Sequence, residues 1–172
     1  MHPAEPRLMA DGETLLVNTF RCGLYRILDW QTENRIVEHI YTFEMADLDL
    51  VPSTCALPVI VGQYWIQTVP SRHGLVTLDM SQPSNPREVG YLNLGDDIYP
   101  HWMAKEPEGT RIVLTGYGKL RHRVMMLDVD SSSGQLSIDR NFGNGGVVNF
   151  EGPAWPHGDT GPAVPHGSVF SN

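Results

Sequence analysis

Three stretches of the sequence are similar to one another and recur with a period of just under 50 residues. They read DGETLLVNTF at 11–20, GQYWIQTVP at 62–70 and EGTRIVLTG at 108–116. Each is followed by a second apolar stretch that ends in aspartate, at Asp29, Asp79 and Asp128. One period holds four β-rich segments separated by polar turns, whereas the 3.6-residue periodicity of helices is weak throughout.

Four strands in 40–50 residues is the pattern of a β-propeller blade. The sequence therefore predicts an all-β chain, a partial β-propeller with blades of four antiparallel strands at about 1–52, 53–98 and 99–150. The tail 151–172 is expected to begin a fourth blade with its inner strand, so that residues 1–172 form a single propeller segment. Asp11-Gly12 suits a tight hairpin turn, and TFEMADLDL at 42–50 is interpreted as a loop between blades.

An arc of three blades exposes strands and edges that a closed ring would cover. We therefore expect either a homo-oligomer, in which a second copy completes the ring, or a segment of a longer chain.

The charge balance excludes some classes of partner. The chain has 12 Lys and Arg against 20 Asp and Glu, a formal net charge of -8, with no basic block to bind a nucleic acid. The longest apolar run, 55–61, is far shorter than the roughly 18 residues of a membrane span, and the N-terminus lacks a signal-peptide pattern. The sequence thus predicts a soluble protein, cytoplasmic or periplasmic, and two cysteines are too few for a disulfide scaffold.

Three repeat-equivalent positions at the starts of inner strands hold Cys55, His101 and His166. Inner strands of a propeller begin around one mouth of the central channel, so these side chains are expected to converge. Imidazole and thiolate are transition-metal ligands, and three protein ligands with an open position are typical of a catalytic site. His157 and His73 lie in loops that could add a ligand, and His157 is expected nearer the site.

Structural roles are the alternatives for these residues. Each histidine of the Pro-His pairs could bond a backbone carbonyl in a turn, and Cys22 could be a small buried side chain, a ligand or the disulfide partner of Cys55. The three repeat aspartates are expected to accept turn hydrogen bonds, and GNGG at 143–146 is expected to be a turn. The tryptophans could line a pocket or pack between blades, namely Trp65, Trp102 and Trp155.

The second half of the sequence resembles a known family. RHGLVTLDMSQPSNPREVGYLNLGDD, VMMLDVDSSSGQLSIDRNFG and GPAVPHGSVFS, within 73–172, are similar to blades and the C-terminal stretch of the selenium-binding proteins, the methanethiol oxidase family. The resemblance implies a seven-bladed propeller that oxidises methanethiol with copper held by histidines. It implies that His166 is the C-terminal metal ligand. Further ligands would come from another chain or from His101, Cys55 and His157.

Three functions follow as hypotheses. The first is a metal-dependent oxidase, with copper at the channel mouth, acting on a small sulfur compound. The second is a non-catalytic propeller module that binds a partner or completes its ring by oligomerisation. The third is a lactonase-like hydrolase on the same fold, because a fold does not fix a function.

Overall fold

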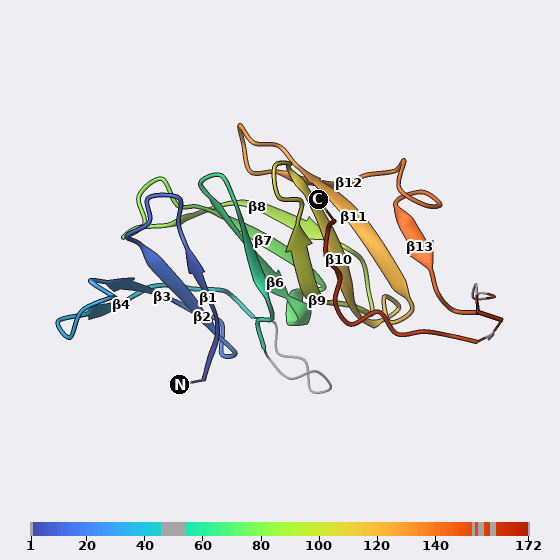
Figure 1. Cartoon of the computed structure of the whole chain (residues 1–172), viewed down its shortest axis with the longest axis horizontal. Coiled ribbons are helices and arrows are strands. Elements are labelled where there is room, and N and C mark those ends of the chain that lie inside the picture. The colour runs from blue at the N-terminus through green and yellow to red at the C-terminus, as the bar shows by residue number, and fades with distance from the viewer. Residues whose placement is uncertain (1, 46–53, 153, 155–156, 159–160, 172) are drawn as a thin grey trace.

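The computed structural model describes residues 2–45, 54–152, 154, 157–158 and 161–171. In this part the chain forms three antiparallel sheets that stand one after another, two of four strands and a third of four strands joined by a fifth, β13 (Val147–Asn149) (Figure 1). This confirms the predicted all-β partial propeller. Among the described residues, the one helical element is η1, the 3-10 turn Pro70–Arg72, and no helix there is long and apolar enough to cross a membrane.

Within each sheet the strands pair in chain order. The first sheet holds β1 (Pro3–Leu8), β2 (Leu15–Thr19), β3 (Gly23–Leu28) and β4 (Ile36–Thr42). The second holds β5 (Pro58–Val61), β6 (Tyr64–Val69), β7 (Gly74–Asp79) and β8 (Arg87–Asn93). The third holds β9 (Ile98–Lys105), β10 (Arg111–Gly118), β11 (Arg123–Val129) and β12 (Leu136–Ile138), while β13 (Val147–Asn149) also pairs with β11.

Turn hydrogen bonds form at Asp11 and at one of the three repeat aspartates, Asp79. Asp11 Oδ1 accepts the backbone N–H groups of Glu13 and Thr14, both at 2.9 Å, and these bonds, led by that of Thr14, lower the pKa of Asp11. Asp79 Oδ1 accepts the N–H of Ser81 at 2.8 Å in the next repeat. Three glycines of the GNGG segment have positive φ, as a turn requires. Of the segment 42–50, residues 43–45 are in no strand or helix, and 46–50 lie outside the described residues.

Each sheet packs on the next through a separate apolar core. The core between the first two sheets contains Leu16, Leu24, Phe43, Trp65, Val76 and Leu78. The core between the second and third contains Ile66, Leu75, Ile112, Leu114, Met125 and Leu127. Because every strand alternates its side chains between two faces, the middle sheet supplies residues to both cores.

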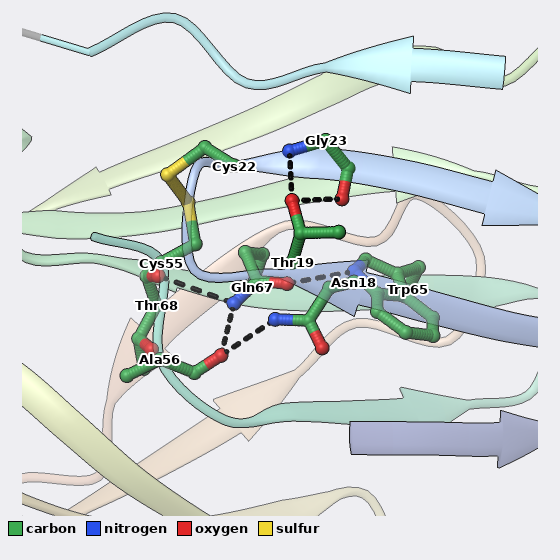
Figure 2. The surroundings of a disulfide bond; sticks show 9 residues. All are labelled: Asn18, Thr19, Cys22, Gly23, Cys55, Ala56, Trp65, Gln67 and Thr68. Atoms are coloured by element: carbon green, nitrogen blue, oxygen red, sulfur yellow. Dashed lines mark hydrogen bonds between the residues drawn. A yellow bond between two sulfur atoms is a disulfide. The ribbon is translucent and has the colours of Figure 1, made fainter. Parts of the chain in front are cut away.

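A disulfide joins the first two sheets inside their shared core (Figure 2). Cys22 lies in the turn between β2 and β3, Cys55 precedes β5, and both are fully buried. The structure thus selects the disulfide among the alternatives for Cys22. Figure 2 also shows amide groups that bridge the same two sheets: Asn18 Nδ2 and Gln67 Nε2 both donate to the Ala56 carbonyl, at 2.9 and 2.6 Å.

The last described segment, residues 161–171, is here called the tail segment. It is extended but belongs to none of the named strands, although the sequence predicts an inner strand in this region. Pro162 and Pro165 have no N–H group to donate to a sheet ladder, which is a physical reason for this difference. The tail segment packs on the far face of the third sheet, where Phe170 joins Phe150 over Val113, Val124 and Met126.

Candidate functional site

The inner strands of the three sheets line a common groove of about 410 Å³, which we call the channel groove. Each sheet supplies residues from its first strand, and the tail segment closes one side. The lining residues are Arg7, Leu8, Val59, Ile60, Trp102, Met103, Ala104, Lys105, Ser168 and Val169. Since inner strands surround the central channel of a propeller, this groove is the channel face of the arc.

An irregularity of β9 gives His101 its position. Trp102 is opposite Thr115 of β10, but the next pair is Pro100 with Gly116, so His101 has no partner of its own in the ladder. An extra residue of this kind is a β-bulge, which redirects a side chain and recurs beside functional sites. The imidazole of His101 lies against the Tyr117 ring, with 5.0 Å between ring centroids.

His166 of the tail segment also lies beside His101. The two imidazole centroids are 5.1 Å apart, and the indole of Trp102 is 6.2 Å from the ring of His166. The structure therefore brings together two of the residues that the sequence singled out, 65 positions apart in the chain. Their neighbour Trp102 lines the channel groove, but the two histidines are not among its lining residues.

Backbone contacts hold the tail segment in this place. Thr115 Oγ1 donates to the carbonyl of His166 at 3.0 Å, and the ring Nδ1 of His122 is 2.7 Å from the Ala163 carbonyl oxygen. Gly167 lies so close to Trp102 that a Cβ there would be 3.2 Å from the indole. The glycine of the Pro-His-Gly sequence is thus the residue that lets the tail segment approach the tryptophan.

Burial and the neighbouring imidazole both lower the pKa of His101, and burial is the larger cause. Its ordinary value is about 6.5. A lower value keeps the ring neutral at pH 7 and over part of the acidic range, so that one ring nitrogen can accept a proton. His101 is accordingly suited to act as a general base.

The other predicted ligands are placed differently. Cys55 is in the disulfide, and a disulfide sulfur carries no thiolate, so in this oxidised state it does not have the form that a metal binds. His157 is exposed in a turn and does not line the channel groove. The Nδ1 atom of His73 lies 3.2 Å from the Ile98 carbonyl oxygen. His73 therefore has a structural role, in which the imidazole contacts a backbone carbonyl. Among the residues that the structure describes, no group of three or more His, Cys, Asp or Glu side chains could hold a metal ion.

The tryptophans have different roles. Trp65 is fully buried between the first two sheets, and its Nε1 donates to Gln67 Oε1 at 3.2 Å. Trp102 lines the channel groove. Trp155 lies outside the described residues.

Sequence reasoning missed the contributions of Tyr117 and Thr115 to this site, whereas it named Trp102 as a residue that could line a pocket. The bulge at His101 gives no repeat signal, because it interrupts the register instead of following it. A second groove, of about 440 Å³, lies on turns of the first sheet and includes Trp30 and Asp29. It holds none of the predicted metal ligands and is not on the inner strands.

Comparison with solved structures identifies the architecture. A hypothetical selenium-binding protein from Sulfolobus tokodaii matches with a TM-score of 0.66 at 16% identity over 92% of this chain and 42% of its own. A protein assigned as a 6-phosphogluconolactonase from Bacteroides fragilis matches with a TM-score of 0.64 at 14% identity over 86% of this chain and 39% of its own. The periplasmic gluconolactonase from Pseudomonas aeruginosa matches with a TM-score of 0.61 at 15% identity, covering 79% and 38%.

The chain has a β-propeller fold. No protein-family model and no curated protein matches the sequence. The chain spans about two fifths of the length of each of these propellers. At identities this low the similarity shows the fold alone.

Proposed function

We propose that the chain supplies the catalytic part of a lactone hydrolase, with the substrate at the Trp102 end of the channel groove and the adjoining His101 as the general base. The observation that carries the proposal is the position of His101: a half-buried imidazole with a lowered pKa, set on a β-bulge beside a groove. Two of the structural neighbours are described as lactonases, which supports this hypothesis over the copper oxidase. The oxidase hypothesis needs a metal site, and none of three or more ligands is present among the described residues.

The chemistry needs one proton acceptor and one water molecule. The neutral imidazole of His101 takes a proton from water as the water oxygen bonds to the lactone carbonyl carbon. The resulting tetrahedral intermediate collapses by breaking the bond between that carbon and the ring oxygen, which receives the proton back from the His101 imidazolium, so that the neutral base is regenerated. The product is a hydroxy acid. Lys105 brings positive charge to the groove, which favours lactones that carry a carboxylate or phosphate group, whereas the charge of Arg7 is paired with Glu5 at 2.8 Å.

The buried disulfide supports an oxidising compartment as the place of action. Disulfides persist in secreted and periplasmic proteins and are rare in the reducing cytosol. Of the two locations that the sequence leaves open, we infer the periplasm.

Replacement of His101 tests the proposal. We expect His101→Gln to lower kcat/KM for hydrolysis of glucono-δ-lactone or its 6-phosphate by about 100-fold or more, because the base is lost while a polar side chain of similar size remains. The rate is followed by proton release in a pH-stat, after subtraction of spontaneous hydrolysis.

His39→Gln is the matched control, because His39 lies on β4, the outermost strand of the first sheet. It should hydrolyse the lactone at the unmodified rate. Equal rates for His101→Gln and the unmodified protein, or no lactone hydrolysis above the spontaneous rate, would refute the proposed function.

A further inference from the structure

The outward face of the first sheet, turned away from the second sheet, is apolar across all four strands. Register places two rows of side chains on it. The first row is Leu8, Leu15, Ile27 and Val37. The second row is Pro6, Val17, Tyr25 and His39. We call these eight residues the open face; none of them is Asp, Glu, Lys or Arg.

Comparison of the three repeats shows that the corresponding face of the other two sheets is buried. Leu15, Trp65 and Ile112 each come three residues after the glycine of the preceding turn, so they are equivalent. Their cross-strand partners are Ile27, Leu78 and Leu127. In the second and third sheets these pairs are fully buried against the sheet before them. The open face is therefore the first sheet's version of a surface that is covered twice elsewhere in the chain.

In the first sheet the equivalent side chains are accessible. None of the eight residues of the open face is buried, and Leu8 and Val37 are 47% and 58% exposed. The opposite face of the same sheet holds Leu16 and Leu24, which are fully buried. A contiguous apolar sheet face of this kind marks an interaction surface.

The other end of the arc is closed. The far face of the third sheet packs against the tail segment, with Phe170 and Phe150 against Val113 and Met126. A head-to-tail ring would have to displace these side chains. Pairing of two open faces displaces no side chain of the tail segment. Because both copies bury the same surface about a two-fold axis, the assembly ends at a dimer.

Charge favours the same contact. The chain carries a formal net charge of -8, so two copies repel each other over most approaches. The two rows of the open face contain no carboxylate, so contact there buries none in an apolar interface.

We propose that two copies of this chain associate by packing their open faces against each other. The interface is a sandwich of two four-stranded sheets, in which aliphatic rows interdigitate as they do between the sheets within the chain. This inference does not depend on the proposed hydrolase function, and it can fail while that function holds.

Sedimentation velocity of the full chain tests the proposal. We expect the unmodified protein to convert from monomer to dimer as its concentration rises through the micromolar range, as a standard small interface gives. Val37→Glu should raise the dissociation constant by about 10-fold or more, because dimerisation then buries an unpaired carboxylate.

Ile36→Glu is the matched control. Ile36 is 50% exposed and adjacent in β4, but it pairs with Leu28 and points to the opposite face. It should leave the dissociation constant unchanged. Both side chains are exposed, so the variant monomers should keep the melting temperature of the unmodified monomer.

Two results would overturn the proposal. One is a protein that stays monomeric over this range, or a dimer that Val37→Glu and Ile36→Glu weaken equally. The other is hydrogen exchange in which dimerisation protects the tail segment as well as strands β1 to β4, since that pattern would mean head-to-tail association. Protection confined to β1 to β4 is the expected result.

Discussion

Removing the disulfide by Cys22→Ala with Cys55→Ala is expected to lower the free energy of unfolding by between about 3 and 4 kcal/mol. The bond closes a loop between residues 33 positions apart, and without it the unfolded chain regains the conformational entropy of that loop. For a chain of 172 residues, this loss should lower the melting temperature by about 10 °C. Urea unfolding and thermal unfolding measure the two quantities.

Reduction provides the control. Because both sulfurs are fully buried, the unmodified protein has to be reduced while unfolded and then refolded with dithiothreitol. It should then be as unstable as the double variant, and dithiothreitol should not affect the double variant. If the reduced and the oxidised protein unfold at the same urea concentration, the disulfide does not contribute to the free energy of unfolding.

Trp65→Ala should destabilise the fold by about 3 to 5 kcal/mol. Trp65 is fully buried in the core shared by the first two sheets. Truncation leaves a cavity that the strands on both sides cannot fill, and it also removes the indole N–H that Gln67 Oε1 accepts.

Trp102→Ala is the comparison for this variant. Trp102 is half-buried on the channel groove, so its loss should cost much less stability and should mainly raise KM for the lactone. A similar loss of stability in both variants would mean that Trp65 is not the principal packing residue between the sheets.

The repeat carries most of what could be predicted of the fold. A period of just under 50 residues with turn glycines at 12, 62 and 109 predicts the four strands that all three sheets share, because side-chain alternation and turn chemistry are local properties of the chain. The same local logic placed the carboxylate of Asp79 in its turn.

The candidate site was predictable only in part. The equivalence of inner-strand positions brought out His101 and His166, which the structure places 5.1 Å apart. The disulfide took Cys55 out of that set, and sequence spacing alone left its pairing with Cys22 open. The bulge at His101 and the docking of the tail segment depend on long-range contacts with β10, which no local pattern encodes.

The pH dependence of kcat/KM for lactone hydrolysis, measured for the unmodified protein and for His166→Gln, tests the central claim most directly. A general base must be neutral, so the rate should fall with decreasing pH only as His101 becomes protonated. Since burial and His166 lower the pKa of His101, the midpoint of this fall should lie below the ordinary histidine value of about 6.5. Removing the charge of His166 should move the midpoint upward. A midpoint that is the same in both proteins, or a rate with no acidic limb, would contradict the assignment of His101 as the base.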